Sequence, residues 1–407
     1  MIKLFKKFLL FSDSQDGASK ALEGILLRYA GAVQASLNWD YSNFSCKILM
    51  YLEKMKIGKK AWEYGFCDSQ RYASIYSAAY ALMIKSFFYG TGAGLSAKER
   101  NEYIEYFLGY QDSKTGYFID PSLEDGDYIN MDNENNLWWG YGHVLLHVIP
   151  CLQILNIKPA FKFKYLEQYF NENTLLLFLD SLNWDTRTHY TGNILMNIGI
   201  PLQYQALILN DKESTVALRA LQNWLYKNAD SETCLWGKLN INNSTERSIA
   251  IQAAYHFWPL FTFESIKIKY NDKTIQAILN TQNKLGGYGL DNFASNGCED
   301  IDSIEPLARF YPLVKGAMRD KILYSLRFAL PWVLANQNQD GGFVFSLNSP
   351  LHYGHPRLTS LSGESNLFAT WWRTLTIAYL SKSLGMPEDF YLVDAPGLCF
   401  PIREGHQ

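Results

Sequence analysis

The sequence predicts an all-α protein built as a single (α/α)6 toroid of six inner and six outer helices. Three observations predict it: a glycine turn that recurs along the chain, amphipathic segments between the turns, and segments after the turns that are apolar on every side. Strand content is expected to be close to zero, because no long stretch alternates apolar and polar residues. With 48% apolar and 15% aromatic residues among 407, the chain is suited to burying a large core.

The recurring turn is clearest in the second half of the chain. Residues 277–288 (AILNTQNKLGGY) and 333–343 (VLANQNQDGGF) both pass from an apolar helical stretch through Gln-Asn to Gly-Gly and an aromatic residue. Weaker copies are residues 110–118 (YQDSKTGYF) and the Leu-Trp-Gly that ends at Gly237. Repetition at this period predicts stacked copies of one helical supersecondary unit.

The outer helices are predicted from apolar residues spaced three and four apart, the pattern of a helix with one buried face. Leu323, Leu326, Leu330 and Leu334 show this spacing. The outer helices are expected near residues 19–36, 97–111, 160–180, 213–228, 272–283 and 317–337.

The inner helices are predicted in the segments that follow the turns. Residues 74–82 and 249–258 are rich in small and aromatic side chains all round, and a helix that is apolar on all sides is buried. Each such segment opens with capping or acidic residues, which mark a helix start. The six openings are expected at residues 68–71, 132–135, 191–193, 244–247, 298–303 and 362–366.

The chain divides into a basic amphipathic N-terminal segment at 1–18, the toroid at 19–385 and an irregular C-terminal strap at 386–407. The first segment places Lys3, Lys6 and Lys7 opposite apolar residues, so it suits peripheral contact with a membrane or packing on its own domain. Both alternatives stay open. No apolar run reaches the length of a membrane-spanning helix.

Charge and cysteine usage exclude several classes of protein. The 37 Lys and Arg residues against 40 Asp and Glu residues give a net charge of −3, which favours neither nucleic acid nor an anionic bilayer. Six scattered cysteines without Cys-x-x-Cys pairs predict reduced thiols in a cytoplasmic protein. Dinucleotide fingerprints, phosphate-binding glycine loops and nucleophile elbows are absent from the sequence.

The strongest chemical motif is Cys298-Glu299-Asp300-Ile301-Asp302-Ser303, with three carboxylates in four residues. Acidic residues at a helix start can be simple caps, but one cap does not require three of them. Crowding and burial raise the pKa of at least one carboxyl group, and an acid held neutral at pH 7 is a proton donor. Glu299, Asp300 and Asp302 are therefore the candidate catalytic residues.

Inner helices that present the same end to one rim would bring further side chains to a shared mouth. A loop between the last turn and the last inner helix would border the same site. His143 and His147, four residues apart, are interpreted as ordinary core histidines. The candidate substrate-binding residues are Arg71, Glu134, Trp138, Asn193, Glu246, Arg247, His355, Arg357, Glu364 and Trp371.

The two Gln-x-x-x-Gly-Gly-aromatic phrases resemble the QW repeats of squalene–hopene cyclases and related turns of protein prenyltransferase β subunits, which share an α/α toroid. In protonation-initiated (class II) cyclases an Asp-x-Asp-Asp motif opens an inner helix after such a turn, and Asp300-Ile-Asp302-Ser303 stands in the matching place. The resemblance covers about residues 210–385. Ser303 replaces the usual third Asp.

This resemblance implies a terpene-cyclase-like enzyme acting on a polyprenyl substrate. Asp302 would protonate an alkene or epoxide, Asp300 would orient it, and aromatic residues would stabilise carbocations. Such chemistry requires no cofactor, although a diphosphate substrate would bring Mg²⁺. The prenyltransferase branch implies zinc instead, with Cys298 and His352 or His355 as ligands. Asn296 in place of the expected Asp argues against zinc.

Two other functions remain open. A carbohydrate-active toroid, such as a glycoside hydrolase, lyase or epimerase, would use the same acidic residues for acid–base catalysis and Trp residues as sugar platforms. A non-catalytic toroid would only bind a lipid or a protein. In either enzymatic hypothesis the partner is a small-molecule substrate, and no nucleic-acid module is present in the sequence.

Overall fold

The computed structural model describes residues 16–123, 140–238, 240–397 and 401–402. Helices make up 59% of it, so the predicted all-α class is confirmed. Strands in these residues form two short antiparallel pairs. One pair joins β1 (Gly65–Cys67) to β2 (Gln70–Ala73), and the other joins β3 (Leu351–His352) to β4 (Thr359–Ser360).

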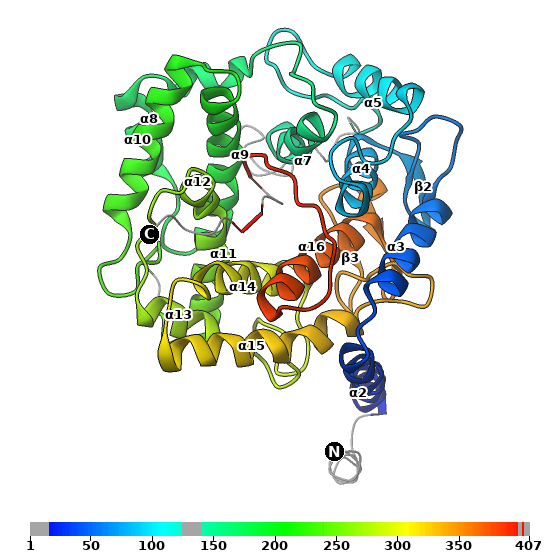
Figure 1. Cartoon of the computed structure of the whole chain (residues 1–407). Helices are drawn as coiled ribbons and strands as arrows, with labels where there is room; N and C mark the ends of the chain where they lie inside the picture. Colours follow the sequence, from blue (N-terminus) through cyan, green and yellow to red (C-terminus); the bar gives the residue numbers. More distant parts are fainter. Residues whose placement is uncertain (1–15, 124–139, 239, 398–400, 403–407) are drawn as a thin grey trace.

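Six buried helices contact one another in a closed order. Each contacts the next along the chain, and the last also contacts the first. Figure 1 shows them around the centre of the molecule. They are α4 (Ile75–Tyr89), α7 (Gly140–Ile154), α9 (Thr188–Leu207), α11 (Ser244–Phe257), α14 (Gly297–Phe310) and α16 (Leu367–Leu384).

Helices at the periphery of Figure 1 alternate along the chain with the buried ones. They are α3 (Tyr41–Met55), α5 (Ala97–Gly109), α8 (Glu172–Ser181), α10 (Lys212–Asn228), α13 (Asp272–Leu279) and α15 (Gly316–Ala335). Most of them bury one face, which in α10 includes Leu218, Leu221 and Leu225, whereas residues 329–335 at the end of α15 are buried on all sides. Shorter helical segments are η2 (Pro121–Leu123), η3 (Lys164–Tyr169), α12 (Pro259–Thr262) and η4 (Pro356–Leu358).

The first peripheral helix differs from the prediction. The helix expected at 19–36 exists as α2 (Asp16–Leu37), but it packs against α15 instead of preceding α4. Its Arg28 side chain donates hydrogen bonds to the carbonyl of Ala335 (2.9 Å) and to Asn338 Oδ1 (2.9 Å). The helix before α4 is α3, whose start is capped by Asp40, a signal that the sequence analysis did not use.

Two predicted helix boundaries also change. Residues 68–71 do not open a helix, because they form the turn and second strand of the β1–β2 hairpin, and Ser74 caps α4 instead. The helix expected at 160–180 is divided into η3 and α8. The opening expected at 132–135 lies outside the described residues.

The recurring turn has the same hydrogen bonds in the three copies that contain a glutamine. The side-chain amide of the glutamine donates across the turn to the carbonyl of a glycine: Gln111 to Gly116 (3.1 Å), Gln282 to Gly286 (2.9 Å) and Gln337 to Gly341 (2.9 Å). The backbone of each glutamine also pairs with the aromatic residue that ends the phrase. The sequence repeat is therefore one structural unit used repeatedly.

The glycine in this turn is required by its conformation and by its close neighbour. Gly286 has a φ of +95°, and an added Cβ would lie 2.0 Å from the carbonyl oxygen of Phe328 in α15. Gly116 and Gly341 have similar φ values, and an added Cβ would approach a backbone carbonyl equally closely. In the copy near residue 237 the matching position is Cys234 (φ +58°), not Gly237.

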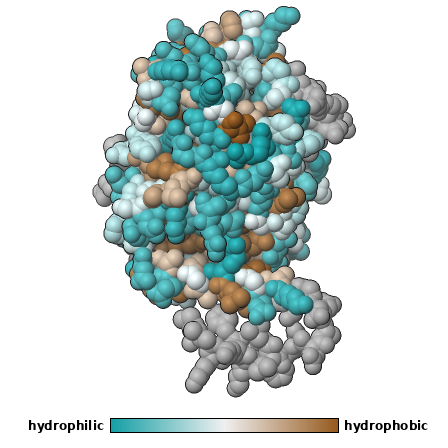
Figure 2. Space-filling view, turned by 90° about the vertical axis from the view of Figure 1, so that its right-hand side faces the viewer, coloured by the Kyte–Doolittle hydropathy of each residue, from teal (hydrophilic) through white to brown (hydrophobic). Residues whose placement is uncertain are grey.

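The C-terminal strap crosses the ring of buried helices in Figure 1. Its described residues contact helices from both ends of the chain: Tyr391 N donates to Phe87 O (2.9 Å), and Arg309 donates to Pro401 O (3.3 Å). The face in Figure 2 is mostly hydrophilic, with hydrophobic residues in small separate groups. No helix of the described residues combines the length and apolarity needed to cross a bilayer.

We predict that Gly286→Ala lowers the free energy of unfolding by more than about 1 kcal/mol, because a Cβ is strained at positive φ and collides with rigid backbone. Urea denaturation measures the change. Gly24→Ala is the control, because nothing lies within 4 Å of its added Cβ and alanine favours a helix. Equal stability of Gly286→Ala and the wild type would contradict the proposed role of the turn.

Candidate functional site

A cavity of about 180 Å³ lies among five of the buried helices. Four of them, α7, α9, α14 and α16, line it mainly with their first turns, whereas α11 lines it with its last turns. The lining residues are His143, Leu146, His147, His189, Asn193, Met196, Gln252, Tyr255, His256, Cys298, Asp302, Tyr353, Phe368, Trp371 and Trp372.

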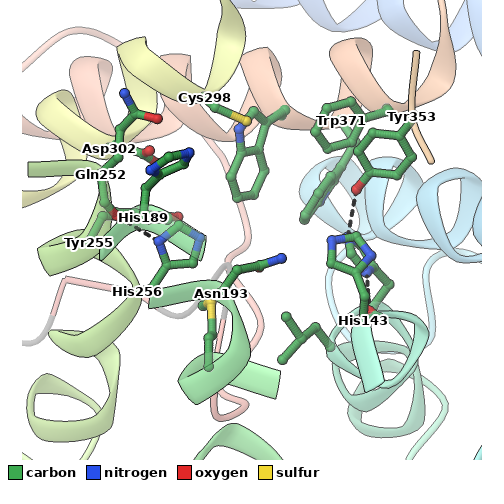
Figure 3. A pocket seen from close by; sticks show the side chains of 15 residues that line it. His143, His189, Asn193, Gln252, Tyr255, His256, Cys298, Asp302, Tyr353 and Trp371 are labelled. Atoms are coloured by element: carbon green, nitrogen blue, oxygen red, sulfur yellow. Dashed lines mark hydrogen bonds between the residues drawn. The ribbon is translucent and has the colours of Figure 1, made fainter. Parts of the chain in front are cut away.

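The cavity has two chemically different sides. Figure 3 shows Asp302, Gln252, Tyr255, His189 and His256 on one side. Trp371, Tyr353 and His143 lie on the other. A ligand in the cavity would therefore contact Asp302 and two histidines on one side, and Trp371, Tyr353 and His143 on the other.

Asp302 is the carboxyl group of this cavity. It lies in the second turn of α14 and is 3% exposed. The described residues form no hydrogen bond or ion pair with its carboxyl oxygens. Burial, followed by the nearby carboxylates of Glu305 and Glu299, raises its pKa well above the usual value for aspartate. This environment favours the protonated, neutral form of the carboxyl group.

Asp300, two residues earlier, has a different role. Its fully buried carboxylate accepts hydrogen bonds from Tyr288 N (3.0 Å), Ser295 Oγ (2.6 Å) and Trp332 Nε1 (3.0 Å). It also forms an ion pair with the buried guanidinium of Arg373, at 2.9 Å. The expectation that Asp300 orients Asp302 is not supported, because the oxygens of Asp300 bond to these four groups instead.

Glu299 caps α14 and does not line the cavity. Its Oε2 accepts from Asn296 N (2.9 Å), while Asn296 Oδ1 accepts from Glu299 N (3.0 Å), which forms a capping box. Burial raises the pKa of Glu299 to about 7. One of the three crowded carboxylates thus serves as a cap, one forms a buried ion pair, and one faces the cavity.

Aromatic rings form much of the opposite wall. Trp371 and Trp372 lie with ring centroids 4.5 Å apart, and Phe368 is 4.1 Å from Tyr353. Their π faces carry negative charge density that attracts cations. Trp371 was among the predicted substrate-binding residues, whereas Phe368 and Tyr353 were not predicted.

Four histidines line the cavity, and the sequence analysis missed them as a group. His147 Nδ1 contacts the carbonyl of His143 (2.9 Å), and His256 Nδ1 contacts that of Gln252 (2.6 Å). Burial lowers the pKa of His147 and of His256 to about 4, and it also lowers the pKa of His143 and His189. The only sequence signal was that His143, His147 and His256 lie in predicted inner segments, whereas His189 precedes the opening predicted at residues 191–193.

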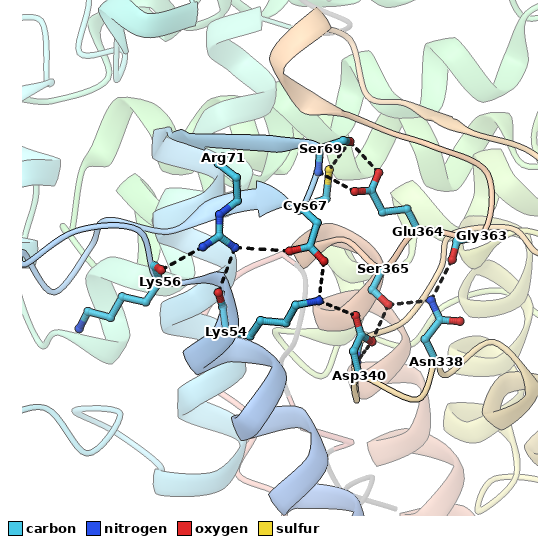
Figure 4. Close-up of polar contacts among 12 residues, drawn as sticks. Lys54, Lys56, Cys67, Ser69, Arg71, Asn338, Asp340, Gly363, Glu364 and Ser365 are labelled. Atoms are coloured by element: carbon cyan, nitrogen blue, oxygen red, sulfur yellow. Dashed lines mark hydrogen bonds and ion pairs between the residues drawn. The ribbon is translucent and has the colours of Figure 1, made fainter.

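Arg71 and Glu364 lie outside the cavity, in the polar contacts of Figure 4. Arg71 donates to the carbonyl of Lys54 (3.0 Å). Glu364 accepts from the backbone N and the side-chain oxygen of Ser69, both at 2.7 Å. These contacts join the β1–β2 hairpin to α3 and to the residues before α16, so they connect the two ends of the chain.

Four further candidates also lie outside the cavity. Glu246 accepts from Asn240 N, and it precedes His256 by ten residues, about 15 Å along a helix. Arg247 donates to Ile241 O, and Arg357 donates to Ser122 O. His355 caps η4. Of the predicted substrate-binding residues, the cavity contains Asn193 and Trp371; Glu134 and Trp138 lie outside the described residues.

The alternative zinc ligands do not all line the cavity. Cys298 lines the cavity, whereas His352 and His355 do not. Within the described part of the chain, no three His, Cys, Asp or Glu side chains are grouped as metal ligands would be. Comparison of the chain with models of known protein families, with curated proteins and with solved structures found no match.

We predict that Asp300→Asn lowers the free energy of unfolding by about 3 to 5 kcal/mol, because it leaves the buried Arg373 guanidinium without its counter-ion. Chemical denaturation at pH 7 measures this loss. In the control Asp185→Asn, the lost ion pair with Lys238 is exposed, so the change should be below about 1 kcal/mol. Similar losses in both variants would argue against a structural ion pair at Asp300.

We predict that Glu299 makes the folded protein less stable as the pH rises from about 4.5 to about 7. Its pKa is raised on folding, so the folded state binds the proton more tightly than the unfolded state in this window. Glu299→Gln keeps the capping box, and it should flatten this part of the curve of unfolding free energy against pH. The control is Glu213→Gln, at an exposed position in the first turn of α10. If Glu299→Gln left the pH dependence of the unfolding free energy unchanged, the raised pKa would not belong to Glu299.

Proposed function

We propose that this chain is an enzyme that protonates a prenyl substrate with Asp302 and so initiates isomerisation or cyclisation. The observation that carries the proposal is the environment of Asp302: a buried carboxyl group without a hydrogen bond from the described residues, at a cavity with an aromatic wall. An acid that keeps its proton at neutral pH is what such a reaction needs.

The proposed chemistry begins at a carbon–carbon double bond of the substrate. The π electrons of the double bond take the proton of Asp302, which leaves a carboxylate and a carbocation. The faces of Trp371 and Trp372 would stabilise this cation, because the negative face of an aromatic ring attracts positive charge. The reaction needs no cofactor, and Mg²⁺ would enter only with a diphosphate group on the substrate.

Cavity size sets a limit on what reacts there. A protein cavity of about 150 Å³ holds a benzene molecule. At about 180 Å³, this cavity accommodates one ring or one end of a prenyl chain. In this proposal the remainder of a polyprenyl substrate extends beyond the cavity.

The proposal includes the architecture and the location of the protein. The closed order of contacts among the six buried helices, with a peripheral helix before each one, supports an (α/α)6 toroid. Reduced cysteines support a cytoplasmic location: the described ones are free. Peripheral membrane contact through the N-terminal segment remains part of the proposal on its sequence pattern alone.

A second candidate is a carbohydrate-active enzyme, and the polar side of the cavity favours it. Asn193, Gln252 and the histidines could form hydrogen bonds with hydroxyl groups, while Trp371 could stack on a sugar ring. In that case Asp302 would again act as the acid, so the two candidates differ in substrate and share the catalytic group.

We predict that Asp302→Asn abolishes turnover, because an amide cannot donate the required proton. The purified enzyme is incubated with farnesyl and geranylgeranyl diphosphates, and products are identified by mass spectrometry. A loss of at least about 1000-fold is expected, within the contribution of a general acid. The control is Asp272→Asn, at the start of α13 and away from the cavity.

Two outcomes would overturn this function. Turnover that survives in Asp302→Asn would eliminate the acid role. Wild-type activity on sugars, with none on either prenyl diphosphate, would select the carbohydrate-active candidate.

A further inference from the structure

His256 faces the same cavity as Asp302, and its tautomer is determined by one hydrogen bond. Its Nδ1 lies 2.6 Å from the carbonyl oxygen of Gln252, one turn earlier in α11. A carbonyl oxygen only accepts hydrogen bonds, so Nδ1 carries the hydrogen. The neutral imidazole therefore has an unprotonated Nε2 with a free lone pair.

Close helix packing fixes the position of this ring. An added Cβ on Gly192 of α9 would lie 3.0 Å from Ala253 Cα and 3.4 Å from His256 Cβ. Glycine and alanine thus allow α9 and α11 to approach closely beside His256. The side chain is held by this contact at one end and by Gln252 O at Nδ1.

The lone pair of Nε2 is available to a ligand. Among the described residues none donates a hydrogen bond to it, and His256 is one of the lining residues of the cavity. His147 has the same Nδ1 contact with a backbone carbonyl, but its Nε2 lies 3.4 Å from the hydroxyl of Tyr353. Of these two imidazoles, His256 is the one whose unprotonated Nε2 has no hydrogen-bond partner among the described residues.

The pKa shifts of Asp302 and His256 favour the neutral form of both groups before the reaction. Burial raises the pKa of Asp302, whereas burial and the neighbouring His189 lower the pKa of His256 to about 4. The proton therefore stays on Asp302 before reaction. A weak base is sufficient later, because a carbocation is a far stronger acid than an imidazolium ion.

We propose that His256 Nε2 is the catalytic base that removes a proton from the substrate after Asp302 has donated one. This inference rests on the proposed function and extends it to the second half of the reaction. One proton enters and one leaves, so the overall reaction is an isomerisation without oxidation or net uptake of water.

The atoms and electrons balance over the cycle. Asp302 gives its proton to one alkene carbon, and a carbocation forms. Nε2 takes a proton from the carbon next to the cationic centre, and the electrons of that C–H bond form the new double bond. The imidazolium ion then returns its proton through solvent to the Asp302 carboxylate, which restores both groups.

The first test is independent of any substrate. In the full-length protein labelled with ¹⁵N-histidine, side-chain NMR should show His256 as the neutral Nδ1–H tautomer from pH 8 to pH 6. The signal is assigned by its loss in His256→Gln, and His147 is the internal reference for the same tautomer. A neutral Nε2–H tautomer, or an imidazolium ion at pH 6, would overturn the proposal.

The second test separates the base from the acid. Geranylgeranyl diphosphate is incubated with each enzyme in D₂O, and both product and recovered substrate are analysed for deuterium. In His256→Gln, Asp302 still donates a deuteron but product should fall at least tenfold. The cation then reverts to the alkene, and when rotation of the adjacent single bond presents the original hydrogen of the same carbon to Asp302, that hydrogen is lost and recovered substrate gains deuterium. Asp302→Asn should give neither product nor deuterium, and Lys212→Gln, exposed on α10, should match the wild type.

The outcomes distinguish the two proposals. Product formation by His256→Gln at the wild-type rate, without deuterium in recovered substrate, would overturn the role of His256 and leave that of Asp302. A wild-type enzyme that neither converts nor deuterates the probe would overturn the prenyl function, and the NMR result would then decide whether His256 holds the base. Circular dichroism of each variant checks that a loss is not caused by unfolding.

Discussion

The buried ion pair between Asp300 and Arg373 is the contact on which the site depends. It joins α14 to α16, the helices that supply Asp302 and the tryptophans of the opposite wall. Three further donors satisfy the Asp300 carboxylate, which is the condition under which a buried charge is tolerated. Because residues two apart on a helix point in different directions, Asp302 is free to face the cavity.

Asp300 and Asp302, two residues apart, therefore have different surroundings. The carboxylate of Asp300 accepts hydrogen bonds from Trp332 Nε1 and from the guanidinium of Arg373. Asp302 lacks such partners among the described residues, and burial followed by the nearby carboxylates of Glu305 and Glu299 raises its pKa, which favours the neutral form. Burial also favours the neutral form of the histidines. Because a histidine is charged when it is protonated, burial lowers its pKa instead of raising it. The cavity thus collects groups that can exchange protons while remaining neutral at rest.

Local signals accounted for most of the helices. The amphipathic spacing predicted α10, α13 and α15 to within a few residues at their starts, because this pattern is set over one or two turns. The turn repeat was visible because its glutamine and glycine interact across only four or five positions. The β1–β2 hairpin was missed, because Cys67 and its neighbours contact Asn366 and Thr359, almost 300 residues away.

The sequence alone determined the all-α class, the repeated turn and the motif that contains the cavity acid, since each depends on residues close together in the chain. Tertiary structure decided which of the three carboxylates faces the cavity, and it placed Glu246 and Glu364 elsewhere. It also brought together histidines from α7, α9 and α11. These outcomes depend on the axial position and rotation of each helix, which packing against distant segments sets and local pattern does not encode.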